Sequence, residues 1–267
     1  MTLMAAPKTA IEFIGVDKRF GKPGSTAEVL AARDVTFSVT TGEVVSIIGP
    51  SGCGKSTLLN MGSGLTKPSA GIVKVADEVV NGPNKHVAFM LQKDLLMPWR
   101  TVAQNIEFGL ELRGTPPAQR HEISQRLIAQ CHLTGFGEHY PHQLSGGMRQ
   151  RSAMARTLAV DPLVLLMDEP FSALDEQTKM ILQQDLARTV SEQGKTVLFI
   201  THDLAEAVAL SDRILVMSER PGTIVKQITV DIPDRHNPMQ RRKHADVGGY
   251  VAMLMDLLKL DANTEVH

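Results

Sequence analysis

The sequence predicts an α/β fold with a largely parallel sheet and a helical segment inserted into it. Short apolar runs without charge, such as Val44–Ile48 and Leu163–Met167, indicate buried strands. Segments with helical periodicity alternate with these strands, which is typical of a sheet covered by helices. Between Lys93 and about Val160 the strand pattern disappears and only helical periodicity remains.

The first part of the chain predicts strands separated by turns. Gly21–Thr26 is rich in turn residues, Thr41–Glu43 contains a glycine turn, and Lys67–Gly71 combines proline, serine and glycine. The expected strands are Ile11–Val16, Val35–Val39, Val44–Ile48, Ile72–Val75 and Val87–Leu91.

The middle segment predicts three helices. Gly114 and Pro116 end the first of them, and apolar residues spaced three and four apart give the second a single apolar face. The expected helices are Thr101–Arg113, Ala118–Cys131 and Ser145–Val160.

The last part returns to alternating strands and helices and ends in a distinct tail. In the tail, the basic run Arg241–Lys243 is expected to be a solvated face, and the apolar run Val251–Leu260 suits a docking helix. We therefore predict a core of residues 11–92 and 161–237, a helical insert over about 93–160, and a tail over 238–267. The expected elements are the strands Leu163–Met167, Val197–Thr201 and Ile214–Met217, the helices Lys179–Glu192 and Leu204–Leu210, and the alternating run Thr223–Ile232.

Composition excludes several classes of protein. The net charge of −1 leaves no basic excess for nucleic acid, and two cysteines make no disulfide framework. No run approaches the roughly 18 apolar residues of a membrane span, and no signal peptide is visible. His139 and His142 lack the further ligands of a zinc site. We expect a soluble, intracellular protein that would serve a membrane only as a separate subunit.

A glycine-rich loop follows the predicted strand Val44–Ile48 and precedes a predicted helix. It matches G-x-x-x-x-G-K-[ST], the P-loop that binds nucleoside triphosphates through inward-pointing N–H groups and a helix N-terminus. Lys55 would reach the β- and γ-phosphates, Ser56 would bind Mg²⁺, and Thr57 would lie at the α-phosphate. An ordinary glycine-rich turn is the alternative, and Cys53 makes ATP binding a target for thiol reagents. The loop comprises Gly49, Pro50, Ser51, Gly52, Cys53, Gly54, Lys55, Ser56 and Thr57.

The strand Leu163–Met167 delivers two acids at its carboxyl end. An apolar strand that ends in Asp168 and Glu169, in a chain with a P-loop, matches the Walker B arrangement. Asp168 would hold Mg²⁺, directly or through water, and Glu169 would act as the general base toward the attacking water. Helix capping is the alternative role for such carboxylates.

The stretch Leu144–Arg151 resembles the signature sequence of ATP-binding cassette (ABC) ATPases, with Met148 where the general pattern has glutamine. Ser145, Gly146 and Gly147 would begin a helix with exposed N–H groups, a second anion site. The resemblance implies a P-loop NTPase (RecA-like) core, an N-terminal antiparallel β-subdomain and an inserted α-helical subdomain. It also implies a homodimer in which two head-to-tail cassettes hold ATP between the P-loop of one and the signature of the other.

Four further positions match motifs of the same family. Gln92 resembles the Q-loop glutamine, which reaches Mg²⁺ and the reacting water and couples to the membrane partner. Asp175, in Ser172–Asp175, resembles the D-loop at the dimer interface. His202 resembles the switch histidine that contacts the γ-phosphate and holds Glu169. Phe20 resembles the aromatic residue that stacks on adenine, although a core or loop-anchoring role is an alternative.

Two stretches, Gln92–Trp99 and Met217–Ile224, resemble the nitrate, sulfonate and taurine importer branch, whereas Asp234-Arg235 departs from the Pro-Arg often found there. This resemblance implies the ATP-hydrolysing subunit of a bacterial importer at the cytoplasmic face of the inner membrane. Its partners would be an integral-membrane permease and, indirectly, a solute-binding protein. The permease would contact exposed apolar residues, namely Leu95, Leu96, Met97 and Trp99, although core packing is an alternative for half of them.

Other members of the superfamily fit less well. Chromosome and DNA-repair ATPases place long coiled coils between the P-loop and the signature, and translation-factor cassettes carry two P-loops. A non-hydrolysing regulator would not need Glu169 and His202. The remaining alternative is the ATPase of another type of ABC transporter.

Overall fold

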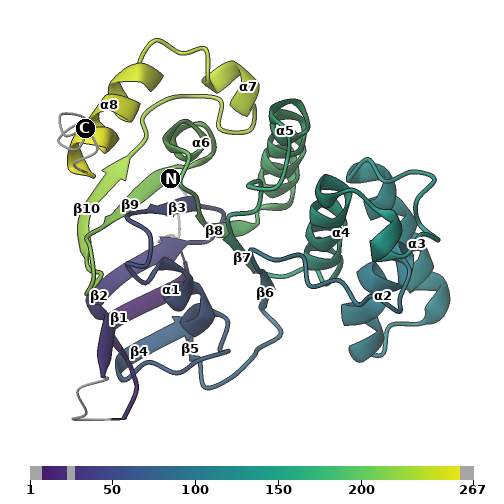
Figure 1. Ribbon diagram of the computed structural model, residues 1–267, viewed down its shortest axis with the longest axis horizontal. Coiled ribbons are helices and arrows are strands. Elements are labelled where there is room, and N and C mark those ends of the chain that lie inside the picture. The colour runs from purple at the N-terminus through teal and green to yellow at the C-terminus, as the bar shows by residue number, and fades with distance from the viewer. Residues whose placement is uncertain (1–7, 23–27, 259–267) are drawn as a thin grey trace, which may run out of the picture.

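The computed structural model describes residues 8–22 and 28–258, which form two sheets and an all-helical lobe (Figure 1). The larger sheet has six strands in the order β10-β9-β3-β8-β7-β6, all parallel except for the antiparallel pair β9 and β10. Its strands are β3 (Val44–Ile48), β6 (Val87–Met90), β7 (Val164–Asp168), β8 (Thr196–Ile200), β9 (Arg213–Met217) and β10 (Ile224–Thr229).

The smaller sheet is antiparallel, as the family resemblance led us to expect. Its order is β2-β1-β4-β5, and the rings of Phe13 and Phe37 stack across its first two strands at 4.6 Å. Its two long strands have 12 residues each, well beyond the predicted runs, and the short edge strand β5 was not predicted. The strands are β1 (Thr9–Phe20), β2 (Val29–Thr40), β4 (Ala70–Val75) and β5 (Glu78–Val79).

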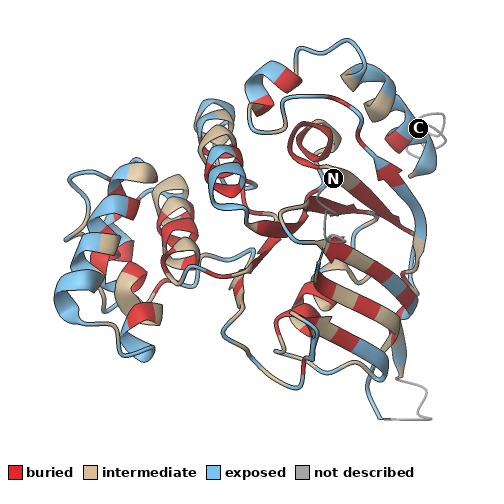
Figure 2. Cartoon of the chain, turned by 180° about the vertical axis from the view of Figure 1, so that it is seen from behind, coloured by how far each residue is buried: buried red, intermediate tan, exposed pale blue. Residues whose placement is uncertain are grey.

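The helix α1 (Lys55–Gly62) lies between the two sheets. Leu58 and Met61 from this helix share one buried cluster with Phe13 from the small sheet and Leu166 from the large one. Every residue of β3, β7 and β8 is buried, and Figure 2 shows burial concentrated in these central strands. Because both faces of a parallel sheet are covered, its strands are continuously apolar rather than alternating.

The opposite face of the large sheet is covered by α5 (Glu176–Gln193) and α6 (Leu204–Leu210). The helix α5 begins three residues before the predicted start, because the Asp175 side chain accepts a hydrogen bond from the Thr178 N–H at 3.0 Å and caps it.

The helical lobe follows β6 and confirms the predicted insert as part of the fold class. Its first helix begins where predicted, since the Thr101 hydroxyl and the Gln104 side chain form a capping box. Val102, Ile106 and Leu127 belong to the separate core of this lobe. The elements are α2 (Val102–Leu112), α3 (Pro117–Gln130), η1 (Pro141–Gln143) and α4 (Gly146–Ala159).

The tail packs on the core more closely than predicted. It forms α7 (Pro238–Arg241) and α8 (Val247–Leu257), and Leu254 of α8 is fully buried. The prediction of a solvated basic run was wrong for Arg241, which is 2% exposed and donates hydrogen bonds to the carbonyls of Ser211 (2.8 Å) and Val230 (3.1 Å). Lys243 is exposed as expected.

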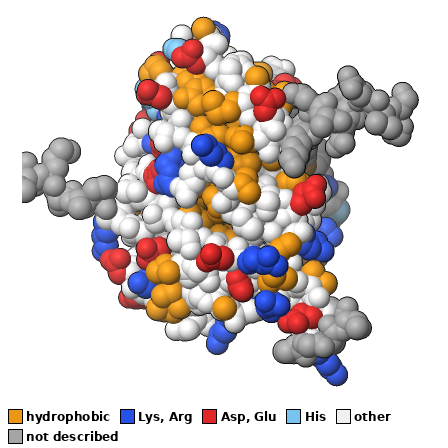
Figure 3. All heavy atoms as spheres, turned by 90° about the vertical axis from the view of Figure 1, so that its left-hand side faces the viewer, with side chains coloured by type: hydrophobic (Ala, Val, Ile, Leu, Met, Phe, Trp, Pro, Cys, Tyr) orange, Lys and Arg blue, Asp and Glu red, His pale blue; other side chains and the backbone are white. Residues whose placement is uncertain are grey.

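Two surface features complete the fold. Figure 3 shows hydrophobic side chains gathered on the side of the molecule where β10 and α8 lie in Figure 1. The helix α8 has three exposed apolar residues, namely Met253, Met255 and Leu257. Within the described ranges, none of the helices has both the length and the apolar character needed to cross a membrane. Parts of two predictions, the loop at 23–26 and the helix end at 259–260, lie outside the described residues.

Candidate active site

The P-loop connects β3 to α1 at the carboxyl edge of the large sheet. Its glycines are required by conformation and by space. Gly54 precedes the helix with a φ of +106°, and a Cβ atom there would lie 2.8 Å from the Ala31 carbonyl oxygen. A Cβ atom on Gly49 would lie 2.9 Å from the Met217 carbonyl oxygen. The loop is therefore packed against its neighbours on both sides and is not a free turn.

Lys55 folds over the loop that it follows. Its Nζ atom donates hydrogen bonds to the carbonyl oxygens of Gly49 (2.6 Å) and Pro50 (2.8 Å) and lies 3.9 Å from the Cys53 Sγ atom. Cys53 is only 1% exposed, so a thiol reagent can reach it only when the loop opens. That such a reagent blocks ATP binding stays a prediction.

Asp168 ends β7 directly behind the P-loop. The Ser56 hydroxyl hydrogen-bonds its carboxylate, which brings the two predicted metal ligands together. Burial raises the pKa of Asp168, and the charge of Glu169 adds to this effect, whereas the Ser56 hydrogen bond and the Lys55 charge lower it.

Glu169 is held at the point where three loops converge. Its backbone lies in the left-handed region with a φ of +48°, and its N–H donates to the Ile200 carbonyl at 3.0 Å. Gln92 Nε2 donates to Glu169 Oε2 at 3.0 Å, and His202 Nδ1 lies 3.5 Å from the same oxygen. An unusual backbone conformation in a non-glycine residue is costly and tends to mark functional sites. The structure therefore brings Gln92, Glu169 and His202 together.

An open cleft extends from the P-loop toward the end of β1. Phe20 lies on its wall, 46% exposed, with Lys18 Nζ located 5.0 Å from its ring centroid. This exposed ring suits stacking on a planar group. Four lining residues were not predicted as site residues, namely Val29, Ala31, Ile200 and Arg220. Arg220 belongs to a stretch that we used only to identify an importer branch, and no local pattern ties it to the P-loop.

The signature residues lie on the helical lobe, away from this cleft. Ser145 caps α4 by accepting a hydrogen bond from the Met148 N–H at 3.2 Å, and Ser145 and Gly146 are exposed. None of the described residues that line the P-loop cleft belongs to the signature. Asp175 does not line the P-loop cleft either. Its carboxylate caps α5. The structure thus separates the two predicted phosphate-binding helix starts within one chain.

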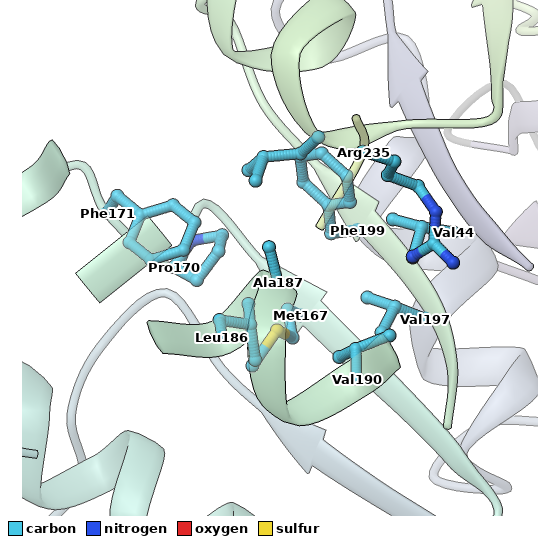
Figure 4. Close-up of a pocket in the computed structure, with 11 residues that line it drawn as sticks. Val44, Met167, Pro170, Phe171, Leu186, Ala187, Val190, Val197, Phe199 and Arg235 are labelled. Atoms are coloured by element: carbon cyan, nitrogen blue, oxygen red, sulfur yellow. The ribbon is translucent and has the colours of Figure 1, made fainter. Parts of the chain in front are cut away.

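A second hollow lies between α5 and the large sheet (Figure 4). Its walls are apolar, and its one charged residue, Arg235, pairs with Asp212 at 2.9 Å and donates to the Gly42 carbonyl at 3.4 Å. Because this arginine binds groups in the turns that precede β9 and β3, we assign the hollow to the core.

Comparison with known proteins agrees with this geometry. A family model described as ABC transporter matches residues 32–172. An uncharacterised ABC transporter ATP-binding protein of Methanocaldococcus jannaschii is 48% identical over 204 residues, which is 76% of each chain. The taurine import ATP-binding protein TauB of Yersinia pestis is 43% identical over 206 residues, 77% of this chain and 81% of that protein.

The fold also has a close structural counterpart. The dimeric post-hydrolysis state of an ATP-binding cassette bound to ADP and Pi matches with a TM-score of 0.75 and 31% identity. The match covers 82% of this chain and 98% of the other.

Proposed function

Because this chain belongs to the ABC transporter family, whose cassettes hydrolyse ATP, we propose that it is the ATPase subunit of a bacterial importer for nitrate-, sulfonate- or taurine-like small anions. The observation that carries the importer assignment is the similarity to the taurine import ATP-binding protein. The stretches Gln92–Trp99 and Met217–Ile224 support the same branch.

Each site residue has a proposed role in hydrolysis. The N–H groups of Gly49–Thr57 and the N-terminus of α1 bind the phosphates, and Lys55 exchanges its loop carbonyls for phosphate oxygens. Phe20 stacks on adenine. Glu169 accepts a proton from the attacking water, while Gln92 and His202 hold its carboxylate in place.

The oxygen donors beside the P-loop fit Mg²⁺. Ser56 and Asp168 already contact each other, and Gln92 donates its amide nitrogen to Glu169, which leaves its carbonyl oxygen free as a ligand. These are hard donors of the kind that Mg²⁺ binds together with substrate phosphates and water. Bound there, Mg²⁺ would neutralise negative charge on the β- and γ-phosphates.

A second copy of the chain completes the site in this proposal. At the start of α4, Ser145 and Gly146 are exposed and Gly147 is half-buried, and none of the three lines the P-loop cleft of the same chain. A head-to-tail homodimer would place this helix N-terminus against the γ-phosphate bound by the partner. The dimeric state of the related cassette supports this arrangement.

The segment after Gln92 is the proposed contact with the permease. Trp99 is 73% exposed and Leu95 is 56% exposed, so both can reach a membrane partner. Arg156 of α4 donates to the carbonyls of Asp94 (2.6 Å) and Leu95 (2.7 Å), and Arg149 of α4 pairs with Asp94 at 3.1 Å. The same segment thus connects Gln92 to the signature helix, which suits transmission of motion to the cytoplasmic face of the membrane.

Purification of the intact transporter tests this proposal. A Glu169→Gln subunit with an affinity tag is purified from detergent-treated membranes, and its partners are identified by mass spectrometry. We expect a permease, and we expect the reconstituted wild-type complex to hydrolyse ATP faster when its solute-binding protein is loaded with taurine, a sulfonate or nitrate. If only neutral or cationic solutes stimulated ATP hydrolysis, the chain would belong to a transporter branch with other substrates. If no membrane protein copurified, the result would favour a non-transport ATPase.

A further inference from the structure

The loop Ser218–Thr223 lies against the outside of the P-loop. It pairs with β2, because the Gly222 N–H donates to the Ala31 carbonyl and the Arg33 N–H donates to the Gly222 carbonyl, both at 3.0 Å. A Cβ atom on Gly222 would lie 2.0 Å from the Cys53 carbonyl oxygen, so a side chain cannot be accommodated there. The close approach places Arg220 at the edge of the nucleotide cleft.

Arg220 contacts the P-loop through two donors on one acceptor. Its Nε and Nη2 atoms lie 3.0 and 2.8 Å from the Gly52 carbonyl oxygen. Among the described residues, Arg220 forms no ion pair with a carboxylate. The guanidinium therefore donates its hydrogen bonds to the P-loop.

The direction of this contact matters for phosphate binding. A P-loop binds anions because its N–H groups point inward, which turns carbonyl groups outward. Gly52 adopts a φ of +74°, a conformation that glycine can leave as readily as it enters. A charged donor on the outward carbonyl opposes any rotation that would turn this oxygen toward the phosphates.

We propose that Arg220 is a positioning residue of the nucleotide site, which holds the Gly52 carbonyl outward and keeps the P-loop closed over Cys53. The proposal rests on the assignment of this loop as the ATP site. It extends that assignment to a residue 168 positions away from Gly52 in the chain.

Cys53 reports directly on whether the loop is closed. It is 1% exposed within the loop, so its alkylation requires the loop to open. The second cysteine is an internal control, because burial and the nearby Asp185 raise the pKa of Cys131 to about 12 and keep its thiol inert. Alkylation of each cysteine by N-ethylmaleimide can be followed separately by peptide mass spectrometry.

The experiment compares Arg220→Met and Arg220→Lys with the wild-type chain. Arg113→Met is a matched control, because Arg113 is also an exposed arginine that donates to backbone carbonyls, those of Lys85 and Val160, but it lies on the helical lobe. In nucleotide-free protein we expect Arg220→Met to speed Cys53 alkylation about tenfold. We also expect KM for ATP to rise about tenfold, because the charged contact with the Gly52 carbonyl is lost. The value of kcat should stay within about twofold of the wild type. Arg220→Lys should restore part of both effects, and Arg113→Met should change neither.

The two measurements separate the possible failures. Unchanged Cys53 alkylation in Arg220→Met overturns the positioning role, and a higher KM with unchanged alkylation would make Arg220 a direct nucleotide contact instead. If Arg220→Met does not fold, Arg220→Gln replaces it, because it also removes the charge, and wild-type alkylation and KM in that variant overturn the proposal equally. A wild-type chain that binds no ATP would overturn the nucleotide site itself, a result distinct from a failure confined to Arg220.

Discussion

Glu169 receives two polar side chains from loops that are far apart in the chain. Gln92 lies 77 positions before it, and His202 follows on the loop after β8. Both contacts involve Oε2, and Oε1 has no hydrogen bond or ion pair with the residues that the structure describes. The arrangement orients a carboxylate before substrate arrives, so little reorganisation is needed at the moment of proton transfer.

Replacement of Glu169 by glutamine should therefore abolish most turnover. The change keeps the shape of the side chain but removes the base, so we expect kcat for ATP hydrolysis to fall about 10²- to 10⁴-fold. An ATP-bound dimer should accumulate, which size-exclusion chromatography with ATP can detect. Glu192→Gln, in an exposed ion pair with Arg188, is the control. Wild-type turnover in Glu169→Gln would remove the residue from this role.

Lys179 of α5 contacts the loop that carries His202. Its Nζ atom contacts Asp203 and lies 3.3 Å from Glu206, whose side chain is only 3% exposed. Burial would lower the pKa of Lys179, but the hydrogen bond to Asp203 and the two negative charges outweigh burial and raise it. Burial would raise the pKa of Asp203, but its hydrogen bonds from Lys179 and the Glu206 N–H lower it.

Lys179→Met should lower the free energy of unfolding by about 3 kcal/mol, since it leaves a buried carboxylate without its counter-charge. Lys195→Met is a matched control, because Lys195 is similarly buried but pairs with the exposed Asp161, so we expect a loss of about 0–1 kcal/mol. Urea titration measures both. Equal losses in the two variants would contradict the special role of Lys179.

The contribution of this pair should depend on pH with a definite sign. The folded-state pKa of Asp203 is depressed, so its stabilisation is present above the ordinary value of 3.8 and is lost as the pH falls through the folded-state value. The folded-state pKa of Lys179 is raised, so its stabilisation is present below 10.5 and is lost as the pH rises through the folded-state value. The difference in unfolding free energy between wild type and Lys179→Met should therefore be greatest between these limits. A difference that is constant from pH 3 to 7 would refute this assignment.

The segment between Gln92 and α2 divides its apolar residues between two environments. Leu96 is 8% exposed and belongs to the same core cluster as Met154, whereas Leu95 and Trp99 point outward. Of the four apolar residues, for half of which core packing was the alternative, Leu96 is buried, Met97 is half-buried and the other two are exposed. The burial of Leu96 anchors the segment, and the flanking residues are left to contact a partner.

Charge on the outward positions should uncouple the transporter. We expect Trp99→Glu to leave ATP binding by the isolated subunit unchanged, because the residue touches no part of the cleft. Transport by the reconstituted complex should fall at least tenfold. Leu96→Glu is the contrasting variant, since a charge in the core should unfold the segment and lower the melting temperature. Loss of ATP affinity in Trp99→Glu would show that this residue supports the fold instead.

In the proposed dimer, each chain would contribute two half-sites, the P-loop and the start of α4, and the start of α4 does not line the P-loop cleft of its own chain. In Figure 1 the helical lobe, which contains α4, lies to the right of the sheets, whereas the P-loop precedes α1, which lies between the sheets. A chain with an intact P-loop and a chain with an intact signature should therefore complement each other across a dimer interface.

Mixed dimers test this directly. Lys55→Ala and Ser145→Arg should each be inactive alone. Mixed in equal amounts with ATP, they should recover up to about a quarter of the wild-type ATPase activity, since half the dimers contain one intact composite site. Lys55→Ala mixed with the double variant provides the control, because no intact site can form. Activity of Ser145→Arg alone at the wild-type level would contradict the composite site.

Local sequence patterns predicted most helices, strands and motifs of this molecule. Features that depend on contacts between distant parts of the chain could not be predicted. The P-loop, Asp168-Glu169 and the three long helices of the insert could be predicted, because each depends on neighbours within a few residues. The contacts of Arg220 and Arg241 could not be predicted, because their partners lie 168 and 30 positions away. These partners are backbone carbonyls, which every residue type has, so no residue pattern indicates them. The predicted boundary at residue 237 stays a prediction.

Arg241 also has a consequence for synthesis of the chain. Its guanidinium binds the carbonyls of Ala209 and Ser211, which end the helix that follows the His202 loop. A ribosome completes every predicted catalytic motif before it reaches this residue, so those carbonyls receive the Arg241 hydrogen bonds only after the motifs have been made. A nascent or prematurely terminated chain would therefore hold all the hydrolytic residues on an incompletely locked core. The tail therefore completes the packing of the core only after all the predicted hydrolytic residues have been synthesised.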